Sequence, residues 1–245
     1  MLVVHHLNDS RSQRILWLLE ELGVPYEIKP YQRDAQTRLA PPELKQVHPL
    51  GKSPVITDGG KTIIESGAII DYVIRRYGKG RMQPAPETAA YDEYVQWMHY
   101  AEGSAMLPLM LNLYAGRLGD AAAPLMPRVE GEIANHLAYI DGALKGRQFI
   151  VGDTLSGADI QMSFVGEVAG AFGKRAQYPN LDAMDQAVAR QACLQESDRK
   201  GRSLQPRELT GARHSAVRRL EPGRQAVRRL RKQNGIGTDC DERTS

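Results

Sequence analysis

The sequence predicts two domains of different class, a small α/β domain followed by an all-α domain. Short β-branched segments alternate with amphipathic segments over residues 1–78, chain breakers fill residues 79–88, and residues 89–192 show helical periodicity without strand patterns. A chain of 245 residues, 42% apolar and 25% charged, is long enough to bury two such cores. This composition excludes a wholly disordered or collagen-like chain.

The α/β domain is expected to follow the order βαβ and then ββα. Residues 2–7 predict a strand and residues 26–31 a second one, parallel to the first because a helix separates them. At most a short helix is expected over residues 43–47. Asp58-Gly59-Gly60 predicts a hairpin, and a closing helix begins at Ser66. The two helices are marked by apolar residues at helical spacing: Ile15, Leu18, Leu19 and Leu22, then Ile69, Ile70, Val73 and Ile74.

Apolar residues at helical spacing predict the helices of the all-α domain. A long helix starts near Tyr91 and is expected to break near Pro108, and a second helix covers residues 129–144. A third begins at a predicted capping box, in which Ser156 caps the free amides and Asp159 bonds back to the cap. A fourth helix follows Pro179-Asn180.

Charge and cysteine content exclude several functions for the two domains. Residues 193–245 hold 13 Lys and Arg against 7 Asp and Glu, a formal charge of +6, which leaves −3 for the first 192 residues. The domains therefore have no general field that would attract nucleic acid. Cys193 and Cys240 both lie in the basic tail, so the domains lack a thiol nucleophile or thiolate ligand. No signal or membrane-spanning pattern is visible, and we expect a cytoplasmic protein.

Three motifs, with the two-domain order, resemble the cytosolic glutathione S-transferases, and the serine-type bacterial and fungal members most of all. The motifs are Ser10-Arg-Ser-Gln-Arg14 with the helix that runs to Gly23, His48-Pro-Leu-Gly-Lys52-Ser53-Pro54-Val55, and Glu65-Ser66-Gly-Ala-Ile. The resemblance covers residues 1 to about 190. It implies a thioredoxin-like N-terminal domain that binds glutathione as co-substrate, an all-helical C-terminal domain, no other cofactor, and a homodimer.

Glu65 and Ser66 stand at a helix start, where free amides and the positive end of the helix dipole favour a carboxylate. Ser66 is expected to bind the γ-glutamyl carboxylate of glutathione and Glu65 its ammonium group; a plain helix cap is the alternative. The resemblance implies a cis Ser53-Pro54 bond that turns the Ser53 backbone toward the cysteinyl residue of glutathione. The alternative is an ordinary trans proline. The same stretch supplies the remaining expected glutathione contacts, Lys52 for the glycyl carboxylate and Val55.

Ser10 is expected to stabilise the thiolate, with Arg11 as an electrostatic helper. Free thiols in model compounds have a pKa of about 8.5, so few of them are ionised at neutral pH. A hydrogen bond to the thiolate increases the ionised fraction. The first strand reads Val-Val-His5-His6 and departs from the tyrosine-type pattern. Ser12 remains a rival, and helix capping is the alternative role for both serines.

The remaining candidates lie outside these motifs. His5, His6 and His99 lack the spacing of a metal site, and we expect structural or surface roles for them. Apolar and aromatic residues of the long helix are candidates for a pocket that binds an apolar electrophile: Tyr100, Met106, Met110 and Tyr114. The expected activity is transfer of the glutathione sulfur to a small electrophile, or reduction of a peroxide. The alternative is a glutathione-binding structural or chaperone-like protein without turnover.

Two interpretations of residues 193–245 stay open. They can form a basic arm that binds acidic partners, or they can result from a reading-frame error. Back-translation of residues 190–206, read one nucleotide later, can give a string that resembles a transferase C-terminus. Under either interpretation we expect the tail to lie outside the functional unit.

Overall fold

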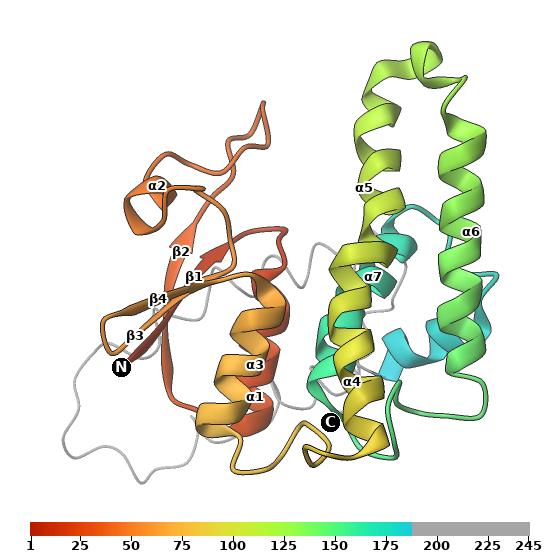
Figure 1. Ribbon diagram of the computed structural model, residues 1–245. Coiled ribbons are helices and arrows are strands. Elements are labelled where there is room, and N and C mark those ends of the chain that lie inside the picture. Colours follow the sequence, from red (N-terminus) through yellow and green to blue (C-terminus); the bar gives the residue numbers. More distant parts are fainter. Residues whose placement is uncertain (188–245) are drawn as a thin grey trace, which may run out of the picture. The chain divides into compact units, whose positions relative to one another are not determined.

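The computed structural model describes residues 1–187 (Figure 1). Its first compact unit spans Met1–Val73, and the second begins at Ile74. The basic tail predicted for residues 193–245 lies outside the described residues.

The first unit is built on a four-stranded sheet with the strand order β2-β1-β3-β4. Strand β1 (Leu2–Leu7) pairs in parallel with β2 (Tyr26–Tyr31) and antiparallel with β3 (Val55–Asp58), and β3 pairs antiparallel with β4 (Lys61–Ile64). The parallel pair follows from helix α1 (Ser12–Leu22), which carries the chain back across the sheet. The predicted βαβ-ββα order is confirmed.

The hairpin between β3 and β4 uses the two glycines that predicted it. Gly59 and Gly60 have φ angles of 54° and 81°, in the left-handed region that a two-residue hairpin turn requires. Asp58 and Lys61 are therefore opposed at the end of the ladder.

Helices α1 and α3 (Ser66–Tyr77) lie side by side on one face of the sheet (Figure 1). The apolar residues that predicted the two helices are all buried there. Helix α2 (Leu44–Val47) is a single turn, and Leu44 forms a separate small cluster with Leu7 and Tyr31. The apolar faces of both long helices thus supply most of this core.

The second unit is helical. Its elements are α4 (Ala89–Tyr100), a π-helix (Ala101–Ala105), α5 (Met106–Ala115), a 3-10 helix (Gly116–Ala122), α6 (Met126–Ala143), α7 (Gly157–Ala171) and a helix over residues 179–187. The apolar residues expected between 129 and 144 are each at most 2% exposed: Val129, Ile133, Leu137, Ile140 and Leu144. None of the helices described within residues 1–187 has the length and apolar character needed to cross a bilayer.

The long helix is interrupted just before Pro108, near the expected place. The chain widens into the π-helix Ala101–Ala105, and Pro108 lies inside α5. Proline has no N–H to donate to the carbonyl four residues earlier, here that of Ser104, and its ring crowds that carbonyl. The disturbance therefore falls in the turn before the proline.

Helix α7 begins with the predicted capping box. The Ser156 Oγ accepts the Ala158 amide at 3.2 Å, and the Asp159 carboxylate accepts the amides of Ser156 at 2.9 Å and Ile150 at 2.7 Å. Burial raises the pKa of Asp159, although these hydrogen bonds act in the opposite direction. The carboxylate thus joins the helix start to the preceding loop.

Candidate functional site

Several chain segments of the first unit meet at one end of its sheet. Strands β1 and β2 both end there because they are parallel, β3 begins there because Val55 pairs with His5, and β4 ends there because Ile64 pairs with Val55. The segments that adjoin these strand ends therefore lie close together. Three of them carry the predicted residues Ser10, Ser53 and Ser66.

Ser10 lies in the turn between β1 and α1 and is 5% exposed. Its Oγ donates to the Leu7 carbonyl oxygen at 2.7 Å and accepts the Ser12 amide at 3.3 Å. Arg11 occupies the N-cap position of α1, and its side chain makes no capping hydrogen bond. The Ser10 hydroxyl thus stands at the positive end of α1, where a developing anion is stabilised.

Ser12 is fully buried and connects Ser10 to β1. Its Oγ lies 2.8 Å from the Ser10 Oγ and 2.8 Å from the Nδ1 of His6. Burial lowers the pKa of His6 to about 4, although the charge of Asp9 acts in the opposite direction. His6 is therefore neutral near pH 7. The sequence did not predict that His6 contacts the serines. The alternation of residues along a strand does not show which helix turn a buried strand residue contacts.

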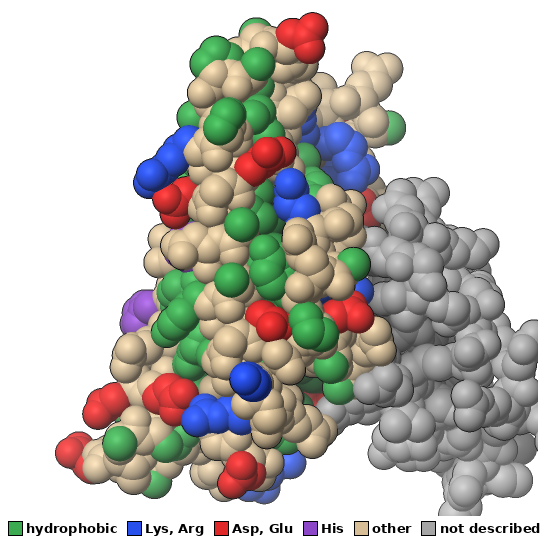
Figure 2. All heavy atoms as spheres, turned by 90° about the vertical axis from the view of Figure 1, so that its right-hand side faces the viewer, with side chains coloured by type: hydrophobic (Ala, Val, Ile, Leu, Met, Phe, Trp, Pro, Cys, Tyr) green, Lys and Arg blue, Asp and Glu red, His purple; other side chains and the backbone are tan. Residues whose placement is uncertain are grey.

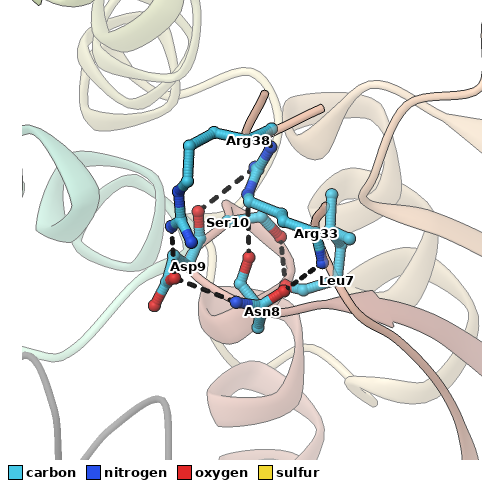
Figure 3. Close-up of polar contacts among 6 residues, drawn as sticks. All are labelled: Leu7, Asn8, Asp9, Ser10, Arg33 and Arg38. Atoms are coloured by element: carbon cyan, nitrogen blue, oxygen red, sulfur yellow. Dashed lines mark hydrogen bonds and ion pairs between the residues drawn. The ribbon is translucent and has the colours of Figure 1, made fainter. Parts of the chain in front are cut away.

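The turn that carries Ser10 is held by two arginines from the loop after β2 (Figure 3). Arg33 donates from its backbone N to the Asn8 Oδ1 at 2.7 Å, from Nε to the Asn8 carbonyl at 3.0 Å and from Nη2 to the Asp9 carbonyl at 3.2 Å. Arg38 pairs with the Asp9 carboxylate at 2.6 Å. Sequence reasoning missed both arginines, because an arginine in a loop carries no signal of its partner.

The Ser53-Pro54 bond is cis, as the resemblance implies. The Ser53 Oγ donates to the His5 carbonyl at 2.9 Å, which ties this segment to β1. Pro54 and Val55 are buried, whereas Lys52 is exposed. The side chain of Ser53 is thus engaged within the unit, and Lys52 is accessible at its edge.

Ser66 opens α3 and is joined to α1 through Arg14. The Arg14 Nη2 donates to the Ser66 Oγ at 2.8 Å, and both residues are nearly buried, at 2% and 4% exposure. Glu65, just before this helix, is exposed and has a φ of 65°. This left-handed conformation is costly for a residue with a Cβ, and such strain clusters at functional sites. Arg14 was recognised only as part of the Ser10–Arg14 motif, so its contact across 52 residues was missed.

The four candidates for the electrophile pocket have different surroundings. The Tyr100 Oη lies 2.6 Å from the His136 Nδ1, and its ring contacts that of Tyr139 on α6. Burial raises the pKa of Tyr100 to about 12. The other three candidates lie four residues apart along α5: Met106, Met110 and Tyr114. Met106 is 1% exposed and Tyr114 is 55% exposed. Tyr100 is therefore engaged with α6.

Among residues 1–187, no three His, Cys, Asp or Glu side chains are grouped in a way that could hold a metal ion. The polar groups at the sheet end include hydroxyls, amides, guanidinium groups, the Lys52 ammonium, the carboxylates of Asp9 and Glu65, and the neutral imidazole of His6. Such groups suit hydrogen bonding to an anionic or zwitterionic ligand.

Two family models match the chain in succession, the glutathione S-transferase N-terminal domain over residues 1–75 and the C-terminal domain over residues 81–192. Glutathione S-transferase 3 of Schizosaccharomyces pombe is 37% identical over 182 residues, which cover 67% of this chain and 72% of that protein. Glutathione S-transferase 1 of Saccharomyces cerevisiae is 34% identical over 224 residues, which cover 82% of this chain and 95% of that protein.

Solved structures give the same assignment. A glutathione S-transferase from Actinobacillus pleuropneumoniae superposes with a TM-score of 0.67 at 30% identity, covering 99% of this chain and 96% of its own. URE2P6 from Phanerochaete chrysosporium, a glutathione transferase in complex with oxidized glutathione, has a TM-score of 0.67 at 21% identity, over 82% and 96% of the two chains, and supports the fold. The chain therefore belongs to the glutathione S-transferase family and is a glutathione transferase.

Proposed function

We propose that this transferase conjugates the glutathione thiolate to small apolar electrophiles and that the Ser10 hydroxyl donates a hydrogen bond to the thiolate. The observation that supports this most is the common location of Ser10, Ser53 and Ser66 at one sheet end, with Ser10 at the start of α1. The hydroxyl and the helix dipole both favour the thiolate over the thiol.

The rest of the glutathione molecule is held along the same end of the sheet. Its γ-glutamyl carboxylate binds Ser66 at the start of α3, and its ammonium group pairs with Glu65. The cysteinyl backbone pairs with that of Ser53, and the glycyl carboxylate meets Lys52. The hydrogen bond from Arg14 to Ser66 orients the serine, which favours the carboxylate site.

In the reaction, the glutathione sulfur forms a bond to an electrophilic carbon while the bond from that carbon to its leaving group, or to the epoxide oxygen, breaks. The thiol proton has already left to solvent when the thiolate forms. A hydrogen bond to a charged sulfur contributes about 1–3 kcal/mol, which lowers the thiol pKa by roughly one to two units. Arg11, at the N-cap of α1, adds positive charge near the thiolate.

The electrophile is expected to contact the four predicted pocket residues, of which the flexible methionines accommodate substrates of different shape: Tyr100, Met106, Met110 and Tyr114. We also propose that the protein is cytoplasmic, needs no further cofactor and forms a homodimer. Light scattering of the purified chain would test whether it is a dimer. Large apolar side chains that are at least 36% exposed gather in and just after α5, and Figure 2 shows hydrophobic side chains between charged ones on one face of the helical unit. They are Leu107, Leu111, Leu113, Tyr114 and Leu118.

Steady-state assays with aryl halides, epoxides and hydroperoxides test this proposal. Ser10→Ala should lower kcat at neutral pH about tenfold or more, whereas Ser66→Ala should mainly raise the KM for glutathione, because Ser66 contacts a remote carboxylate. Retention on glutathione resin without turnover would favour a structural or chaperone-like role instead. A change in the pH profile with Ser12→Ala but not with Ser10→Ala would overturn the assignment of Ser10.

A further inference from the structure

A continuous chain of hydrogen-bonding groups runs from β1 to the start of α1. The His6 Nδ1 lies 2.8 Å from the Ser12 Oγ, and the Ser12 Oγ lies 2.8 Å from the Ser10 Oγ. All three side chains are nearly buried, with exposures of 2%, 0% and 5%. Water therefore has little access to reorient these protons, and the groups themselves determine the direction of the chain.

Each hydroxyl carries one proton. The Ser12 Oγ also lies 3.3 Å from the Leu7 carbonyl oxygen. Its contacts with the Ser10 Oγ and the His6 Nδ1 are shorter, at 2.8 Å each. Along these shorter contacts the chain can be oriented in two ways. If the His6 Nδ1 carries the imidazole proton, His6 donates to Ser12, Ser12 donates to Ser10, and the Ser10 proton is available to a third acceptor. If the proton is on Nε2, Ser12 donates to the bare Nδ1 and can accept the proton of Ser10. The second direction draws the Ser10 proton away from any ligand.

The surroundings of the His6 ring favour the first direction. Its Nε2 is buried and has no hydrogen-bond partner among the described residues. A proton on Nε2 would leave a buried N–H without an acceptor, and such orphaned donors are rarer than orphaned acceptors. With the proton on Nδ1, every donor of the chain has an acceptor, since Ser10 donates to the Leu7 carbonyl at 2.7 Å.

We infer that His6 and Ser12 are positioning residues, which direct the Ser10 proton toward the glutathione thiolate through the donor sequence His6, Ser12, Ser10. This inference rests on the proposed role of Ser10. When the thiolate binds, only the last bond changes, because the Ser10 proton turns from the Leu7 carbonyl to the sulfur. The Ser12 proton stays on the Ser10 oxygen, and a hydroxyl that accepts one hydrogen bond is a stronger donor of another.

The neighbouring histidine provides a matched control. His5 uses both ring nitrogens in contacts away from this chain, with Nδ1 3.0 Å from the Tyr31 hydroxyl and Nε2 3.4 Å from the Thr57 hydroxyl. It is 5% exposed, close to the 2% of His6. Replacing His5 therefore removes a buried histidine of the same strand without breaking the connection to Ser10.

The test is a titration of glutathione bound to the full chain, followed by the ultraviolet absorbance of its thiolate. His6→Leu and Ser12→Ala should each raise the pKa of the bound thiol by about 0.5 unit or more, a roughly threefold loss of thiolate at neutral pH. His6→Asn, whose side-chain amide places a donor near the Nδ1 position, should restore the wild-type value. His5→Asn should leave the thiol pKa unchanged.

Ser10→Ala separates the two proposals. If Ser10→Ala leaves the thiol pKa unchanged, the proposed role of Ser10 fails. If Ser10→Ala raises the pKa but His6→Leu and Ser12→Ala do not, only the positioning role is overturned.

A second measurement needs no substitution. Nitrogen-15 chemical shifts of the imidazole in the wild-type chain should identify His6 as the tautomer protonated on Nδ1. A proton on Nε2 would overturn the inference even if the His6 variants fail to fold.

Discussion

Helices α1 and α7 both begin beside a serine, but the two serines have different partners. At α7, Ser156 and Asp159 satisfy the helix amides and each other, so the polar groups of that start are used up within the fold. At α1, the N-cap Arg11 makes no side-chain capping bond, and Ser10 and Ser12 are joined to His6. The serine at the start of α7 thus serves the fold, whereas Ser10 is the serine that we propose turns toward a ligand.

This difference distinguishes a cap from a candidate site. A capping box can be recognised from four consecutive residues, because all its partners are local. The proposed site serine, Ser10, is joined through Ser12 to the strand residue His6, and its local sequence looks like that of a cap. Substitutions at the two helix starts and at Glu65 should therefore affect stability and the site to different degrees.

Replacing the buried carboxylate of α7 should give the largest effect. Asp159→Ala leaves the amides of Ser156 and Ile150 without their acceptor, and we expect a loss of roughly 3–5 kcal/mol in the free energy of unfolding. Urea denaturation measures it. Asp159→Asn, which keeps one acceptor oxygen, is the milder control. The contrast would break down if Asp159→Ala shifted the thiol pKa of bound glutathione, because α7 would then influence the site.

The buried histidine of the α1 region should make stability depend on pH. The pKa of His6 is lowered from 6.5 to about 4 in the folded chain, so between these values the unfolded chain binds more protons. The free energy of unfolding should therefore fall as the pH is lowered from 6.5 to 4, by about 3 kcal/mol from this residue.

Burial also lowers the pKa of His5, which acts in the same direction. Urea midpoints measured across this pH range should fall less steeply for His6→Asn than for the wild-type chain. Equal slopes for the two proteins would show that His6 does not cause the pH dependence.

The smallest effect on stability is expected at Glu65. Glu65→Gly relieves the left-handed conformation at φ 65°, so the free energy of unfolding should stay equal or rise by up to about 1 kcal/mol. The KM for glutathione should nevertheless increase, because the proposed partner of its ammonium group is lost. Glu65→Gln, which keeps the strain and removes the charge, separates the two effects. A clear loss of thermal stability in Glu65→Gly would show that Glu65 stabilises the fold.

The fold was largely predictable because its signals are local. The apolar spacing around Ile15 and Leu19, the stop at Gly23 and the turn Gly59-Gly60 each depend on neighbours within a few residues. The interruption near Pro108 was also predictable, and it lies in the turn before the proline because the missing N–H of a proline disturbs the preceding turn.

The connections within the site were less predictable. Ser10, Ser53 and Ser66 were identified through motifs, but the contact of Arg14 with Ser66 joins residues 52 positions apart. The link from His6 to Ser12 depends on the rotation of α1 over the sheet. Tertiary packing sets both, and no local pattern encodes it.

The π-helix between α4 and α5 also affects how this chain can vary. A π-helical turn accommodates an extra residue without interrupting the helix. In a regular α-helix, gain or loss of one residue rotates everything downstream by about 100°, the angle per residue. Loss of one residue within Ala101–Ala105 would instead let this turn close to an α-helical one. Met106, Met110 and Tyr114 would then keep their common side of the helix, so the chain can change its length by one residue here without moving this row.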